Sequence, residues 1–204
     1  MKSYDTISDI EIDVLREVGN IGAGNAATAL ADILADRVDM TVPELKVVDV
    51  SEMTSILGGP ENEMVGILVN MTNDVEGMLM FLLDKNFTHL LINVLLDENI
   101  EDFSSITDMG LSALMEIGNI LSGAYVNALS TMTDLNIQLS PPQIAVDMVG
   151  AILSFPAAQF GEMGDKLLLI EENFQSGQES VKSHLLIMPE MNSLDTILNK
   201  LGVS

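Results

Sequence analysis

The chain has 204 residues, 48% of them hydrophobic, which is enough apolar material for a sizeable folded core. Acidic residues outnumber basic ones 31 to 8, and the formal charge of −23 argues against nucleic acid or anionic membrane surfaces as partners. The absence of cysteine excludes disulfides, thiolate nucleophiles and cysteine-ligated metals. With no apolar signal core at the N-terminus and no apolar run of membrane-spanning length, we expect a cytoplasmic protein.

The first half of the chain predicts one long helix followed by strands. A Ser-x-x-Glu capping box at Ser8, with apolar residues at helical spacing behind it, predicts a helix over 8–35. Strand candidates follow at 38–50, where Pro43 breaks the strand or places it at an edge, and at 64–71 and 75–83 across a short polar turn. A helical pattern over 85–97 completes this half.

The second half repeats the same order. A helix is predicted over 105–132, strands at 135–140, 166–170 and 181–188, and a last helix over 190–202. Hairpin-length connections favour antiparallel pairing. We therefore expect an α+β fold that is internally duplicated, with an antiparallel-rich β-sheet, long helices packed on it, and pseudo-two-fold symmetry. We interpret residues 1–204 as a single domain made of two repeats, about 1–103 and 104–204, that share one core.

A short helical phrase occurs twice and is the main evidence for duplication. Glu-Val-Gly-Asn-Ile at 17–21 recurs as Glu-Ile-Gly-Asn-Ile at 116–120, which is 99 residues later. An Asp or Ser precedes each Glu, and a Pro follows each Asn, at the same spacing in both copies. The first copy comprises Asp13, Glu17, Asn20 and Pro43, and the second Ser112, Glu116, Asn119 and Pro142.

The spacing places the first three residues of each copy on one helix face. Positions i, i+4 and i+7 of an α-helix fall within a sector of about 60°. A Glu and an Asn three apart on a solvated helix are ordinary, but Asn is a mediocre helix former and here stands in mid-helix twice, in register. Local rules tend to be broken at functional sites. We therefore expect each polar triplet at the rim of the buried helix face, within reach of a partner.

The glycines near the first copy suggest an alternative that the sequence disfavours. Gly-Ala-Gly-Asn-Ala-Ala at 22–27 resembles a dinucleotide fingerprint, but that motif opens a helix after a strand, whereas this helix has already run for several turns. The second copy also has Leu121 in place of Gly22. We interpret the repeated glycines as small residues that let the two motif helices approach each other; they are Gly19, Gly24, Gly118 and Gly123.

Other catalytic constellations are missing from the sequence. His89 and His184 lie in apolar contexts without metal-ligand spacing, so we expect packing or edge positions for both and no metal site. There is no P-loop and no nucleophile elbow. An enzyme with this sequence must therefore act by positioning and electrostatics.

The doubled pattern [Asp/Ser]-x3-Glu-x2-Asn-x22-Pro resembles the signature of the CheC/CheX/FliY phosphatase family, and the likeness covers nearly the whole chain. The resemblance implies a hydrolase that acts on the phospho-aspartate of the chemotaxis response regulator CheY. In this family an Asn amide holds the attacking water in line, which assigns that role to Asn20 and Asn119. Glu17 and Glu116 are the matching anchors that dock on the regulator.

The resemblance also implies what surrounds these residues. Asp13 and Ser112 have a supporting role, and Pro43 and Pro142 shape the chain after each helix. The chain needs no cofactor of its own, because Mg²⁺ is expected in the response regulator. The deamidase CheD is expected as a second partner, with Asp147 in the segment 142–153 as its candidate contact; the alternative is a solvated Asp on a partly exposed helix.

Two other functions stay open at this point. A FliY-like flagellar switch phosphatase is expected to carry further segments on both sides of the core, which this sequence does not show, and CheX-like members have one motif copy and dimerise. The two copies here favour a monomer. A non-catalytic adaptor that binds phosphorylated CheY or CheD is the alternative from another class, although intact Glu and Asn in both copies favour activity.

Overall fold

The computed structural model describes residues 4–35, 38–41, 44–160, 166–176 and 179–203. Each half contains a long helix, two short strands, a shorter helix, a β-hairpin and a final helix. The first half consists of η1 (Tyr4–Thr6), α1 (Asp9–Leu34), β1 (Val38–Met40), β2 (Glu44–Asp49), α2 (Val50–Ile56), β3 (Glu63–Asn73), β4 (Gly77–Leu83) and α3 (Lys85–Leu96). The second half consists of η2 (Phe103–Ser105), α4 (Asp108–Thr133), β5 (Ile137–Leu139), β6 (Gln143–Met148), α5 (Val149–Phe160), β7 (Lys166–Ser176), β8 (Glu179–Pro189) and α6 (Met191–Lys200). This order confirms the predicted duplicated α+β fold.

The strands form one antiparallel sheet to which both halves contribute. The two hairpins lie side by side at its centre, in the order β7, β8, β4, β3. The short strands then cross over: β1 and β2 of the first half pair with β7, whereas β5 and β6 of the second half pair with β3. Because each half completes the sheet next to the other half's hairpin, backbone hydrogen bonds join the two halves into one sheet.

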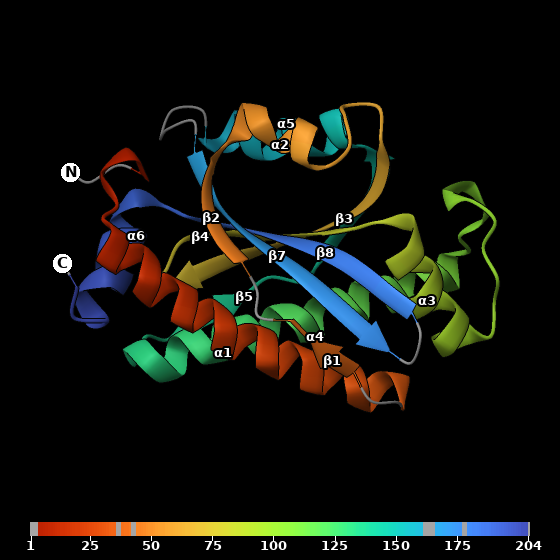
Figure 1. Ribbon diagram of the computed structural model, residues 1–204, viewed down its shortest axis with the longest axis horizontal. Coiled ribbons are helices and arrows are strands. Elements are labelled where there is room, and N and C mark those ends of the chain that lie inside the picture. Colours follow the sequence, from red (N-terminus) through yellow and green to blue (C-terminus); the bar gives the residue numbers. More distant parts are fainter. Residues whose placement is uncertain (1–3, 36–37, 42–43, 161–165, 177–178, 204) are drawn as a thin grey trace.

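Helices cover the two faces of this sheet unequally. Figure 1 shows the long helices α1 and α4 below the sheet and the short helices α2 and α5 above it. The larger core lies under α1, α4, α3 and α6 and contains residues such as Leu30, Phe81 and Leu114. The smaller core lies under α2 and α5 and is rich in methionine, including Met53, Met64 and Met80. No helix in the described ranges is both long and apolar enough to cross a bilayer.

The helix and strand bounds agree closely with the sequence pattern. The Ser8 side chain accepts a hydrogen bond from the Glu11 N–H and forms the predicted capping box of α1. Helix α4 begins at Asp108, capped by Thr107, three residues later than predicted, because a short 3-10 turn precedes it. The predicted strand 38–50 is divided into β1 and β2, and Pro43 lies outside the described residues.

The interpretation of the repeated glycines was wrong. Gly19 and Gly118 face the sheet: a Cβ added at Gly19 would lie 3.0 Å from Ile170, and one at Gly118 would collide with Ile67. A Cβ at Gly24 or Gly123 would meet nothing within 4 Å. The motif glycine next to each Asn therefore lets its helix pack closely on the sheet, rather than on the other motif helix.

Candidate functional site

The second motif copy lines a groove on the outer side of α4. Ser112, Glu116 and Asn119 are all exposed on this helix. They face the connection between β5 and β6 across an open groove with a volume of about 530 Å³. The groove is lined by Ser112, Met115, Glu116, Asn119, Leu139, Ser140, Pro141 and Pro142. The fold thus brings together all four residues singled out in this copy.

Both walls of this groove are anchored to strand β3. On one side, the Ser140 N–H donates to the Asn70 carbonyl oxygen at 2.9 Å, and the Asn70 N–H donates to Ser140 Oγ at 3.0 Å. On the other side, α4 packs on the same strand through Gly118 and Ile67. Because a rigid central strand positions both walls, the groove is formed before any partner binds.

The first motif copy lies on the equivalent face of α1. Asp13 and Glu17 are exposed, and Asn20 is half-buried. Arg16 Nη1 donates to Asp13 Oδ1 at 2.5 Å. The Asn20 amide nitrogen lies 3.5 Å from Glu17 Oε2, at the limit of a hydrogen bond, and Asn20 Oδ1 is buried without a hydrogen-bond partner among the described residues. Pro43, the fourth residue of this copy, lies outside the described ranges.

These two faces offer hydrogen-bonding groups rather than a covalent nucleophile. A carboxamide donates through nitrogen and accepts through oxygen, so it can hold a water molecule in a fixed direction. Asn119 is exposed and Asn20 is half-buried, so both side chains reach the surface, although the Asn20 oxygen itself is buried. Within the part of the chain that the structure describes, no cluster of three or more His, Cys, Asp or Glu could hold a metal ion.

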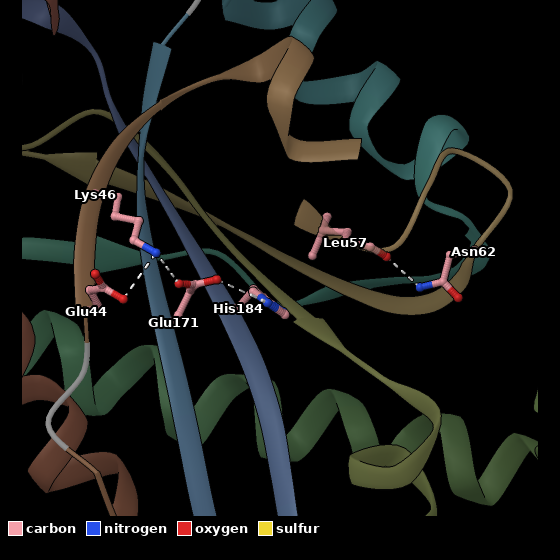
Figure 2. Close-up of polar contacts among 6 residues, drawn as sticks. All are labelled: Glu44, Lys46, Leu57, Asn62, Glu171 and His184. Carbon is pink, nitrogen blue, oxygen red and sulfur yellow. Dashed lines mark hydrogen bonds and ion pairs between the residues drawn. The ribbon is translucent and has the colours of Figure 1, made fainter. Parts of the chain in front are cut away.

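The ionic residues on the opposite face of the sheet form a separate group. Figure 2 shows Lys46 of β2 between Glu44 and Glu171, with Nζ at 3.1 Å and 2.7 Å from their carboxylate oxygens. These two hydrogen bonds raise the pKa of Lys46. His184 Nε2 lies 3.9 Å from the other oxygen of Glu171. Burial lowers the pKa of His184, which fits its predicted packing role.

The remaining histidine lies apart from both motif faces. His89 lies on α3 with its Nε2 3.2 Å from Asn99 Oδ1, and it borders a polar groove with several asparagines. In a separate part of the molecule, drawn in Figure 2, Asn62 donates to the Leu57 carbonyl oxygen at 2.6 Å and closes the turn between α2 and β3. Neither histidine contributes to the motif sites.

Asp147 lies on a strand and not on a helix. It is an exposed residue of β6, opposite Met64 of β3, and its carboxylate accepts a hydrogen bond from the Met148 N–H at 2.7 Å. The helical alternative for this segment was therefore wrong up to Met148, because β6 pairs with β3 before α5 begins at Val149. Asp147 borders an apolar groove of about 250 Å³ that also contains Ala145, Ile152 and Phe155.

Sequence reasoning missed some residues next to the motif. Met115 lines the groove of the second motif copy although it is not part of the motif pattern. Its spacing, three residues after Ser112 and four before Asn119, is a signal that could have identified it. The wall residues Leu139 and Ser140 could not have been identified in this way, because the pairing of β5 with β3 brings them there.

Comparison with known proteins gives a consistent result. The model of the CheC-like family matches residues 10–47 and 109–146, which include both motif copies. The chain is 33% identical to "CheY-P phosphatase CheC" of Bacillus subtilis, over 100% of both sequences. It is 28% identical to "Flagellar motor switch phosphatase FliY" of the same organism, over 69% of this chain and 36% of that protein.

Solved structures show the same fold. Thermotoga maritima FliY superimposes with a TM-score of 0.77 at 23% identity, covering 97% of this chain and 98% of that one. The chemotaxis protein CheX of Desulfovibrio desulfuricans superimposes with a TM-score of 0.52 at 16% identity, covering 84% of this chain and 99% of that one.

Proposed function

This chain belongs to the CheC-like family, and from that premise we propose that it is a phosphatase that hydrolyses the phospho-aspartate of the response regulator CheY. The observation that carries the proposal is the pair of accessible Glu and Asn faces, in register on two helices, in a chain related over its full length to a CheY-P phosphatase. Each face is one active site.

In the proposed mechanism the chain supplies position and the substrate supplies the reactive bond. Asn20 or Asn119 inserts beside the acyl phosphate and holds a water molecule in line with the phosphorus atom. The water oxygen forms a bond to phosphorus while the bond from phosphorus to the aspartate oxygen breaks. The aspartate leaves as a carboxylate, the water proton passes to phosphate or solvent, and inorganic phosphate is released. Orientation of this kind can lower a barrier by several kcal/mol without a tuned base.

The other motif residues position the regulator. Glu17 and Glu116 are exposed carboxylates that can pair with a cationic side chain next to the phosphorylated aspartate. Pro142 and its neighbours form a fixed wall against which the regulator rests. Mg²⁺ belongs to the regulator in this proposal, where it neutralises the developing charge on the phosphoryl oxygens. The reaction takes place in the cytoplasm, with the phosphatase as a monomer.

CheD is the second proposed partner, and the surface around Asp147 is its proposed contact. The exposed carboxylate beside an apolar groove, with Phe155 47% exposed, offers both charge and apolar area. This surface lies on β6 and α5, on the face of the sheet opposite the motif helices. The separation leaves both motif sites accessible while CheD is bound.

The test is phosphate release from phosphorylated CheY in the presence of wild-type protein, Asn20→Ala, Asn119→Ala and the double variant. We expect a partial loss of acceleration in each single variant and a loss of about 100-fold or more in the double variant. Asn25→Ala is the matched control, because Asn25 is exposed on α1 but points away from the motif face. Unchanged release with the double variant would contradict the mechanism.

The same assay separates the phosphatase from an adaptor. A non-catalytic adaptor binds phosphorylated CheY and leaves the rate of phosphate release at its spontaneous value, even with the wild-type protein. Binding without acceleration would therefore favour the adaptor.

A further inference from the structure

The two motif sites differ in the residues beside the conserved Glu and Asn. Met115, which stands between Ser112 and Asn119 in the sequence, lines the groove of the second site. The residue 99 positions earlier is Arg16, which has the same place relative to Asp13 and Asn20 on α1. At ~100° per residue, Arg16 lies about 40° from Asn20 around the helix, on the side away from Glu17. The first site therefore has a guanidinium where the second has a thioether.

The difference involves a pair of residues and not one alone. Arg16 is held by Asp13, the first residue of its motif copy, through a hydrogen bond of 2.5 Å. In the second copy both members change together, to Met115 and Ser112, while the Glu and the Asn are kept. Ser112 Oγ instead donates to the carbonyl oxygen of Asp108 at 2.9 Å, within its own helix. One site thus has an ion pair beside the Asn, and the other has an apolar rim.

The difference between Arg16 and Met115 affects how each site can bind an anionic phosphoryl group. Arg16 is the only basic residue within the sequences of α1 and α4, and the chain as a whole carries −23. A phosphoryl group that approaches either helix meets a repulsive field. The pair of Arg16 and Asp13 adds no net charge, but it provides a cationic hydrogen-bond donor beside Asn20 that the second site lacks. The guanidinium has five N–H donors in a planar fork that suits phosphate oxygens, and the bond to Asp13 occupies one terminal nitrogen. Its side chain is 44% exposed, so it can reach a partner.

We propose that Arg16 is a substrate-binding residue of the first site that donates hydrogen bonds to the phosphoryl oxygens of the regulator, whereas the second site binds the regulator through the apolar rim around Met115. Asp13 is a positioning residue, because it holds the guanidinium beside Asn20. The inference rests on the proposed phosphatase function and deepens it: the two sites bind the same substrate by ionic and by apolar contacts, and they respond differently to salt.

The experiment measures each site alone. Asn119→Ala leaves the first site, and Asn20→Ala leaves the second; kcat and KM for phosphorylated CheY are measured for both at about 0.05 and 0.5 M salt. We expect kcat/KM of the first site to fall several-fold more than that of the second, because salt screens exposed charges. Adding Arg16→Met to the Asn119→Ala variant should lower kcat/KM about tenfold, mainly through KM, and remove the excess salt response. Arg16→Lys should retain the salt response and only part of the affinity.

Lys200→Met is the matched control, since it removes one exposed positive charge that stands on α6 and not on a motif helix. If Arg16→Met and Lys200→Met change kcat/KM equally, the assignment of Arg16 is wrong. A binding measurement identifies the group that Arg16 contacts. Both motif asparagines are replaced, so that no phosphate is released, and Arg16→Met is added to this variant. The addition should weaken binding of phosphorylated CheY and leave binding of unphosphorylated CheY unchanged. Equal weakening of both would overturn the phosphoryl contact. If neither single-site variant accelerates phosphate release at all, the proposed function itself fails.

Discussion

The two halves of the fold differ in the residues through which their long helices pack on the sheet. In the second half, Tyr125 of α4 packs against Gly22 of α1, and its hydroxyl donates to Glu172 of β7, which is 1% exposed. Ser183 of β8 donates to the other oxygen of Glu172.

Equivalent positions of the two halves are 99 residues apart in the helices α1 and α4, and 103 residues apart in the strands β3 and β7. The matching contacts Gly19 to Ile170 and Gly118 to Ile67 give these two offsets. The equivalents of Gly22, Tyr125 and Glu172 are Leu121, Ala26 and Val69, all apolar and all buried.

The comparison shows what a duplicated chain can do that two identical subunits cannot. A glycine and a tyrosine on one side stand where the other side has a leucine and an alanine, so each pair combines a small and a larger residue. The carboxylate has no counterpart in the first half. Burial raises the pKa of Glu172 to about 7, although the hydroxyls of Ser183 and Tyr125 work against that rise. Glu172 therefore adds a pH-dependent contribution to stability that its counterpart Val69 cannot make.

The largest expected effect comes from truncation of the aromatic ring. Tyr125→Ala removes a large buried side chain and leaves Glu172 without one of its donors, so we expect the free energy of unfolding to fall by about 4 kcal/mol. Tyr125→Phe keeps the ring and removes only the hydroxyl, which should cost about 1 kcal/mol. Urea unfolding of both variants measures the difference. Equal effects would mean that the ring packs no better than an alanine.

The second effect is a pH dependence at Glu172, whose counterpart in the first half is the apolar Val69. Because the folded chain binds the Glu172 proton more tightly than the unfolded chain, this group favours folding below pH 4.5, and its contribution is lost as pH rises through about 7. The loss amounts to roughly 3 kcal/mol. We expect the stability of wild type relative to Glu172→Gln to decline across this window and to stay level above it. Urea unfolding of both proteins at several pH values measures this; a constant difference would contradict the buried, proton-binding carboxyl.

The smallest effect concerns Gly22, against which the Tyr125 ring packs. A Cβ at Gly22 would lie 2.5 Å from the Tyr125 ring, so Gly22→Ala should destabilise the protein by about 2 kcal/mol through overpacking. Gly24→Ala on the same helix is the control. No atom lies within 4 Å of its added Cβ, and alanine favours a helix, so this change should stabilise by up to about 1 kcal/mol. Thermal unfolding compares the two, and opposite signs are the expected result.

Much of the fold follows from local patterns that the sequence displays. Ser8 and Glu11 predicted the start of α1 because a capping box is a contact within one turn. The hairpin pattern predicted β3 and β4, and the repeated Glu and Asn predicted two equivalent helix faces. The exchange of short strands between halves was not predicted, since nothing in a three-residue strand such as β5 specifies its distant partner.

The sequence alone determined the duplication, the α+β class and the two polar faces, because helical periodicity and internal repetition need no knowledge of distant contacts. Tertiary structure decided how each face is completed. It placed Met115 and Pro142 around one Asn, and it turned the motif glycines toward the sheet and not toward each other. It also buried Glu172 beside Tyr125, 47 residues away in the chain. Such contacts join residues far apart in the sequence, so only the packing of helices on the sheet reveals them.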